Sequence, residues 1–271
     1  MRLGGIPDSP KQPMVHNDFM RQISSGAYLI TQVLLMNALA APVLAAAEPD
    51  AKKRAWEVYE RARERAGAEP SAQPVRDYTF DLVTRTNNPK EKDKQIELTS
   101  KGFFLTPNLV RQEIQAPNAK IIVVFDGEKG WQMLPNDVRY LSDGASAQIK
   151  ADLARSHVLL AEPPAPDQVR FLREEEVDGR MTEVIELNDV GNMPLRLFVE
   201  KKTGDVIKKM FVGDTPTGLA QVEELYSDFR VVGGYRWPFV KRVLRNGKFA
   251  LESTTLGMKV NLGLTKNDMI R

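Results

Sequence analysis

The sequence has 271 residues, of which 27% are charged and 42% are hydrophobic, as is typical of a folded globular protein. Lys and Arg total 38 and Asp and Glu total 36, so the chain lacks the basic excess of a nucleic-acid-binding protein, and we expect no nucleic-acid partner. The absence of cysteine excludes disulfides, thiolate catalysis and Cys-ligated zinc, and only two histidines are present. We therefore expect no metal and no cofactor.

The N-terminal segment has the pattern of an export signal. Residues 20–47 have a short basic start at Arg21, continue with an apolar stretch and end with small residues. This order predicts a secretory signal peptide that is cleaved after Ala45 or Ala47, and hence export to the periplasm. A retained membrane anchor is the alternative, although polar residues interrupt the apolar stretch. Residues 1–19 lack hydrophobic periodicity and are interpreted as a disordered, over-long start, so that translation begins at Met1 or Met20.

The remainder, residues 48–271, is predicted to be one domain. Residues 50–66 are rich in helix formers and are followed by Gly67 and Pro70, which predicts a helix. Alternating apolar and polar residues then predict strands up to residue 142, and residues 143–162 switch to helical spacing. Strand patterns resume and continue to about residue 261, separated by glycine-containing turns.

The pattern predicts a mainly β protein of ten to twelve antiparallel strands, with one helix before them and one inserted. A sheet of that size curls or splits, because the twist between strands accumulates, and curling gives it a concave face. In the segment "YSDFRVVGGYRWPFVKRV", residues 226–243, a Gly-Gly pair predicts a hairpin. Pro238 lacks an N–H group, so we expect the second arm to be an edge strand or to carry a bulge.

Three segments, in this order, resemble the LolA/LolB-like superfamily of periplasmic lipoprotein carriers. They are "VVFDGEKGWQM" (residues 123–133), "PLRLFVEKKTGDVIKKM" (194–210) and "LYSDFRVVGGYRWPF" (225–239). The resemblance covers roughly residues 52–270. It implies an unclosed, strongly curved antiparallel β-barrel with a helical lid and an apolar cavity for lipid or for the acyl chains of lipoproteins. We expect the exported protein to be a monomer and not an enzyme.

The candidate ligand-binding residues are apolar side chains on the predicted strands and on the inserted helix, and core packing is the alternative for each. They are Phe80, Leu82, Phe125, Trp131, Met133, Leu153, Leu197, Met210, Tyr226, Trp237 and Phe239. We expect residues 147–160 to form a lid that competes with the ligand for the same surface. An envelope sensor or structural module that recognises a protein or lipopeptide segment without transport is the alternative function, and an uncharacterised hydrolase, with polar residues converging in the hollow of the sheet, is the third.

Catalytic patterns are weak in this sequence. Ser156 and His157 are helix neighbours whose side chains point about 100° apart, so they do not pair as in a Ser-His-Asp triad. The run Glu174-Glu175-Glu176 is interpreted as a solvated hairpin shoulder rather than a metal or acid-base site. No phosphate loop, HExxH or GxSxG motif occurs. We therefore predict no catalytic residues.

Overall fold

The computed structural model describes residues 49–67, 69–87, 94–116, 119–215 and 218–270. The predicted signal peptide and the residues before it lie outside the described residues. Among the residues described, no helix has both the length and the hydropathy needed to cross a membrane.

The described chain contains thirteen strands in one sheet. The expected ten to twelve strands are too few, because the estimate relied on glycine turns, whereas the segment between β5 and β6 contains none. The strands are β1 (Asp77–Asn87), β2 (Gln95–Leu105), β3 (Leu109–Ala116), β4 (Ala119–Phe125), β5 (Gly130–Leu134), β6 (Asp137–Tyr140), β7 (Val169–Val177), β8 (Arg180–Leu187), β9 (Leu195–Glu200), β10 (Val206–Thr215), β11 (Gly218–Val232), β12 (Tyr235–Arg245) and β13 (Lys248–Val260). The helices are α2 (Pro49–Ala66), α3 (Asp143–Ser156), the 3₁₀ helix η1 (Pro166–Gln168) and α4 (Lys266–Ile270).

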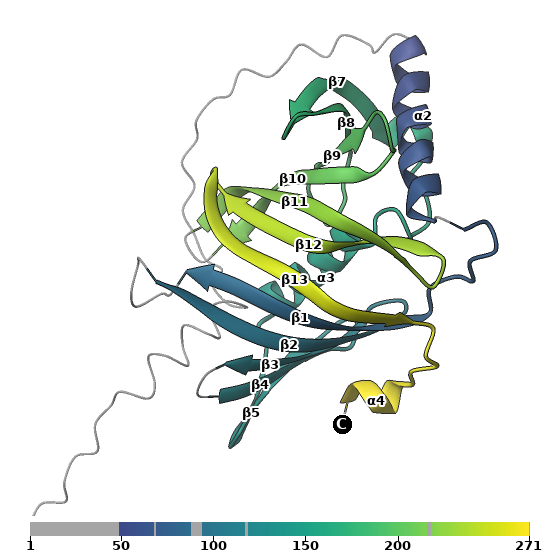
Figure 1. Cartoon of the computed structure of the whole chain (residues 1–271). Coiled ribbons are helices and arrows are strands. Elements are labelled where there is room, and N and C mark those ends of the chain that lie inside the picture. Colours follow the sequence, from purple (N-terminus) through teal and green to yellow (C-terminus); the bar gives the residue numbers. More distant parts are fainter. Residues whose placement is uncertain (1–48, 68, 88–93, 117–118, 216–217, 271) are drawn as a thin grey trace, which may run out of the picture.

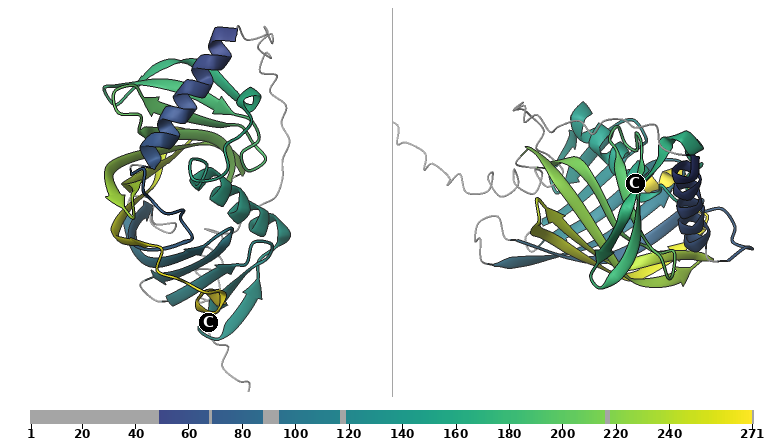
Figure 2. Two further views of the ribbon diagram at one scale, coloured as in Figure 1. Left: turned by 90° about the vertical axis from the view of Figure 1, so that its right-hand side faces the viewer. Right: turned by 90° about the horizontal axis from the view of Figure 1, so that it is seen from above.

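The sheet consists of two antiparallel meanders that meet in its middle. Its order is β6-β5-β4-β3-β2-β1-β13-β12-β11-β10-β9-β8-β7, so the first and last strands of the chain are neighbours. The ends β6 and β7 do not pair with each other, and the sheet stays open. It curves around α3, which lies in its hollow, as the left view of Figure 2 shows. This architecture confirms the predicted unclosed, mainly β fold with a helical lid.

Helix α2 covers the β7–β10 end of the sheet (Figure 1). Its residues Ala55, Val58, Tyr59 and Ala62 are each at most 1% exposed and pack into the main hydrophobic cluster with strands β8 and β9. Basic residues along the same helix make ion pairs with the sheet: Arg54 contacts Glu174 and Glu183, Arg61 contacts Glu183, and Arg65 contacts Asp205. Glu174 thus helps to fix α2, and is more than a solvated hairpin shoulder.

Helix α3 connects the two meanders. The Ser142 hydroxyl accepts a hydrogen bond from the Ala145 N–H at 3.3 Å and caps its first turn. A Cβ at Gly191 would lie 2.8 Å from the Ala151 carbonyl oxygen, so only glycine lets the β8–β9 connection pass so close to α3. The helix ends at Ser156, earlier than the predicted 162, and residues 157–160 form a turn.

The hairpin between β11 and β12 is confirmed, with Gly233 and Gly234 at φ of 62° and 82°. The expectation of an edge strand or of a bulge at Pro238 is wrong for the strand as a whole, because β12 lies between β11 and β13 and its register shift falls between Val243 and Leu244. It pairs with β11 from Tyr235 to Arg245, but with β13 only from Val240 to Arg245. Pro238 therefore lies in the half of β12 whose ladder faces β11 alone, where a missing N–H is tolerated.

Candidate ligand-binding site

A cavity of about 280 Å³ lies on the concave face of the sheet, where β12 and β13 separate. Side chains from β1 and from β10–β13 form its walls, and the C-terminal end of α2 and the turn after α3 close over it. The turn contributes His157, Leu159 and Leu160. The predicted lid segment thus lies on the cavity side of the sheet.

A bulge between β1 and β13 shapes the apolar wall. Phe80 pairs with Met258 and Leu82 pairs with Thr255, so that two residues of β13 span one step of β1. The extra residue is Leu256, which is 63% exposed, whereas Thr255 and Met258 both line the cavity. The bulge thus turns Thr255 and Met258 toward the same side.

His157 lies at the aromatic end of the cavity. Its ring stacks on Phe104 with centroids 4.4 Å apart, and Trp237 packs nearby against Tyr78. Nδ1 lies 3.0 Å from the Leu153 carbonyl oxygen and Nε2 lies 2.7 Å from the Tyr78 hydroxyl. A neutral ring that donates from Nδ1 and accepts at Nε2 satisfies both bonds.

Burial governs the protonation of this pair. It lowers the pKa of His157 to about 4, despite the hydrogen bond to the Leu153 carbonyl. Burial also raises the pKa of Tyr78 above its ordinary value. The pair is therefore neutral near pH 7, and both His157 nitrogens are occupied, which leaves neither for Ser156.

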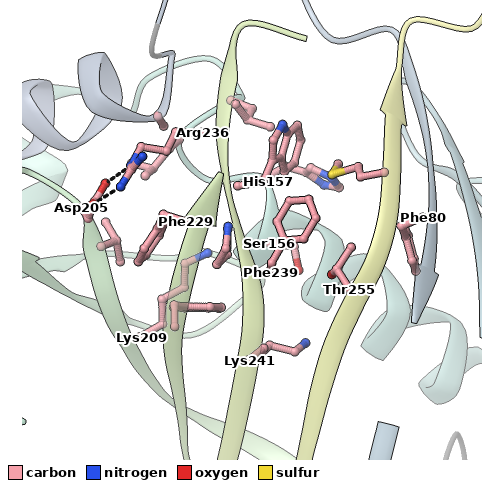
Figure 3. Close-up of a pocket in the computed structure, with 18 of the residues that line it drawn as sticks. Phe80, Ser156, His157, Asp205, Lys209, Phe229, Arg236, Phe239, Lys241 and Thr255 are labelled. Carbon is pink, nitrogen blue, oxygen red and sulfur yellow. Dashed lines mark hydrogen bonds and ion pairs between the residues drawn. The ribbon is translucent and has the colours of Figure 1, made fainter. Parts of the chain in front are cut away.

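The other end of the cavity is polar and basic. Lys209 on β10 and Lys241 on β12 line it (Figure 3), and Lys209 is close enough to His157 for its charge to lower the pKa of that ring. Burial lowers the pKa of Lys209 to about 8. Burial also raises the pKa of Glu224, but the charges of Lys241 and Lys209 and the Tyr226 hydroxyl outweigh burial and hold that pKa below its ordinary value.

The rim of the cavity carries an ion-paired group. Asp205 is 6% exposed and accepts two hydrogen bonds from Arg236, at 2.7 and 3.1 Å, and one from Arg65 at 3.1 Å. The pairing between Asp205 and Arg236 is visible in Figure 3. It ties the end of α2 to β12 across the start of β10.

Five of the candidate residues line the cavity and six lie elsewhere. Those in the cavity wall are Phe80, Leu82, Tyr226, Trp237 and Phe239. Those elsewhere are Phe125, Trp131, Met133, Leu153, Leu197 and Met210.

Strand register places Trp131 and Met133 on the convex face. Directly paired residues share a face, and the pairs run from Phe80 through Gly102, Gln112 and Val123 to Gln132. Because successive residues of a strand alternate between faces, the neighbours of Gln132 point away from the cavity. They cannot contact a ligand held beside Phe80.

The other four residues are packed or lie away from the cavity. Leu197 is 0% exposed in the core beneath α2, and Phe125 is 1% exposed. Met210 packs against a second cluster that contains Phe198 and Ile207. Leu153 is half-buried on α3, where its carbonyl binds the His157 ring.

The candidate residues do not include the polar lining or two aromatic residues of the cavity wall, Tyr78 and Phe229. Tyr78 continues the alternation of Phe80 and Leu82, so the same pattern could have identified it. Lys209 follows Lys208 between apolar residues of β10, where alternation forces one of two consecutive lysines to face inward. Met258 gave no comparable signal, because its orientation depends on the bulge.

Comparison with models of protein families and with curated proteins gives no match. Solved structures do match. A LolA superfamily protein from Nitrosomonas europaea is 17% identical, with a TM-score of 0.52 over 80% of this chain and 97% of that one. A DUF1329 family protein from Desulfovibrio piger is 16% identical, with a TM-score of 0.53 over 81% of this chain and 97% of that one. Together with the open, curved sheet and the helix in its hollow, these matches show that the chain has a LolA-like fold.

Proposed function

We propose that this protein is a periplasmic carrier that holds lipids, or the acyl chains of lipoproteins, in the cavity on its concave face. The observation that supports this most directly is the mainly aromatic and aliphatic wall of the cavity near β1, β12 and β13, and no helix among the described residues fills this cavity. The cavity volume of about 280 Å³ is near the lower end of the range for small-molecule binding sites, which is roughly 300–1,000 Å³.

The energetics favour an apolar guest. Removing one CH₂ group from water contributes about 0.8 kcal/mol, so a few acyl carbons offset the cost of moving a short surface segment. The turn after α3 contributes Leu159 and Leu160 to the wall. A ligand that enters there replaces these contacts, and the lid replaces the ligand on release. This mechanism needs no catalytic group.

Two variants of neighbouring residues test whether the cavity holds the ligand. Thr255→Trp places a large ring in the cavity, whereas Leu256→Trp places the same ring on the opposite, solvent-exposed side of the bulge. We expect mass spectrometry of lipid extracts to find acyl species with the wild type and with Leu256→Trp, and several-fold less with Thr255→Trp. Absence of acyl species from all three proteins would contradict a lipid carrier and favour recognition of a protein segment.

The proposed location has its own test. The intact mass of the protein recovered from the periplasm should correspond to cleavage after Ala45 or Ala47, and gel filtration should show a monomer. A mass that retains the apolar stretch, together with membrane fractionation, would indicate an anchored protein instead.

A further inference from the structure

We infer that the ligand is an amphiphile with an anionic head, a carboxylate or a phosphate monoester, which Lys209 and Lys241 bind at the polar end of the cavity. This inference rests on the proposed function, because it assigns the polar end of the same acyl-binding site. The acyl chain then extends toward Phe80, Trp237 and Met258.

The charges that line the cavity are unequal. Four lining residues are basic, namely Arg65, Lys209, Arg236 and Lys241, and one is acidic, Asp205. Both arginines bind Asp205, and Arg236 does so through two nitrogens. The two lysines therefore provide the cationic groups with capacity to bind a ligand.

Lys209 has few partners for a buried charge. The residue is 7% exposed, and Nζ donates a hydrogen bond to the Arg155 carbonyl oxygen at 2.7 Å. The Tyr226 ring lies 5.5 Å from Nζ, and an ammonium group has three N–H donors. Within the part of the chain that the structure describes, no carboxylate forms an ion pair with Lys209. A buried charge that has no ion pair of its own and shares the field of Glu224 with Lys241 is costly, and an anionic ligand would reduce that cost.

The acidic groups near Lys209 already bind other side chains. Glu224 lies 3.7 Å from Nζ of Lys241 and also accepts the Tyr226 hydroxyl. Arg155, the other buried cation nearby, pairs with Asp152 at 2.6 Å. One carboxylate, Glu224, thus serves two ammonium groups, which leaves a net positive charge at this end of the cavity.

Neutral polar groups complete the head site. Ser253 pairs with Lys241 across the β12–β13 ladder, and Thr255 follows on the same side of β13. The Thr255 hydroxyl is suited to donate to an anionic oxygen, and the Ser253 hydroxyl can do so when it accepts its 2.8 Å hydrogen bond from Thr84. An acyl chain in ester or amide linkage, as on a lipoprotein, would bring no such charge.

Ligand pairs that differ only in head charge test the inference. Dodecanoate, dodecyl phosphate and methyl dodecanoate are titrated, below their critical micelle concentrations, against wild-type protein preloaded with the neutral fluorophore Nile red. Lys209→Met and Lys241→Met remove the two charges. Lys259→Met is the matched control, because Lys259 is exposed on β13 and does not line the cavity.

We expect both anions to bind the wild type about tenfold or more tightly than the ester, since hydrogen bonds to charged groups have this magnitude. Lys209→Met should abolish most of the difference, Lys241→Met should reduce it, and Lys259→Met should preserve it. Equal affinities for anion and ester, or a difference that survives Lys209→Met, would overturn the inference and leave the carrier function standing. If none of the three ligands binds, both the inference and the carrier function are overturned.

Inorganic phosphate is included to separate a lipid head from free phosphate, and stronger competition by phosphate than by dodecyl phosphate would also overturn the inference.

Discussion

The two ends of the concave face carry the same alternating apolar pattern, but their side chains are buried to different extents. Beneath α2, residues such as Ile185, Leu195 and Leu197 are all 0% exposed. Beside the end of α3, Phe80 and Leu82 on β1 remain half-buried and border a cavity. The strands are similar, so the difference arises from what covers them.

Helix α2 fits closely because its inward residues are small or flat. Ala55 and Ala62 bring its backbone near the sheet, Tyr59 fills the remaining space, and ion pairs fix both ends. The end of α3 reaches the cavity through a turn, which covers the sheet less completely. A LolA-like sheet can therefore be a packed core at one end and a binding site at the other.

The largest expected effect compares one substitution in the two regions. Leu197→Ala should lower the free energy of unfolding by about 2–5 kcal/mol, because it removes a buried side chain and leaves a new void. Leu82→Ala should cost clearly less, because its side chain already borders empty space. Urea denaturation measures both.

The same pair separates stability from binding. Leu82→Ala should weaken binding of an acyl probe, whereas Leu197→Ala should leave the affinity of the folded fraction unchanged. Equal losses of stability in the two variants would mean that the cavity region is packed as tightly as the core.

The second expected effect is a loss of folding stability at acidic pH. His157 has a pKa of about 4 in the folded protein and about 6.5 when unfolded, so the folded state binds fewer protons between these values. Stability should therefore fall as the pH drops from about 6.5 to about 4, by up to about 3 kcal/mol. Lys209 adds a nearby positive charge that disfavours protonation, and Tyr78 contacts the ring. His157→Gln should remove this dependence in urea titrations at several pH values.

The α2 region should respond at lower pH. Burial raises the pKa of Glu183, but Arg54 and Arg61 hold it below its ordinary value of 4.5, so its stabilising contribution is lost only as the pH falls below that value. His157→Gln should retain this lower transition. A variant that still loses stability between pH 6.5 and 4.5 would show that another group responds in that range.

Much of the fold could be predicted from local pattern. Helix formers before Gly67 indicated α2, and Gly233-Gly234 indicated a hairpin whose positive φ angles favour glycine. Resemblance in three segments indicated the curved, open sheet. The helix and the hairpin depend on a few neighbouring residues, whereas the resemblance that indicated the sheet extends over most of the chain.

Which residues line the cavity could not be predicted in the same way. Leu82 and Leu197 have equivalent strand patterns, and only the position of α2 separates them. Trp131 requires the register of five successive strands before its face is known. These properties are set by tertiary packing, which alternation along one strand does not determine.

The smallest expected effect compares two glycines on the concave face. A Cβ at Gly102 would lie 2.0 Å from Cζ of Phe80, and a Cβ at Gly130 would lie 2.5 Å from Cδ1 of Leu141. The Phe80 ring can move into the cavity, whereas Leu141 is 7% exposed and enclosed. Gly102→Ala should therefore cost about 1 kcal/mol and Gly130→Ala more, within the roughly 1–3 kcal/mol typical of overpacking.

Binding should show the opposite order. Gly102→Ala pushes the Phe80 ring into the space of the ligand and should weaken acyl binding, and Phe80→Leu in the same chain should restore it by shortening that side chain. Gly130→Ala should leave binding unchanged, because Leu141 does not line the cavity. If Gly102→Ala binds as the wild type does, the Phe80 ring has moved elsewhere, and the wall beside β1 does not contact the ligand.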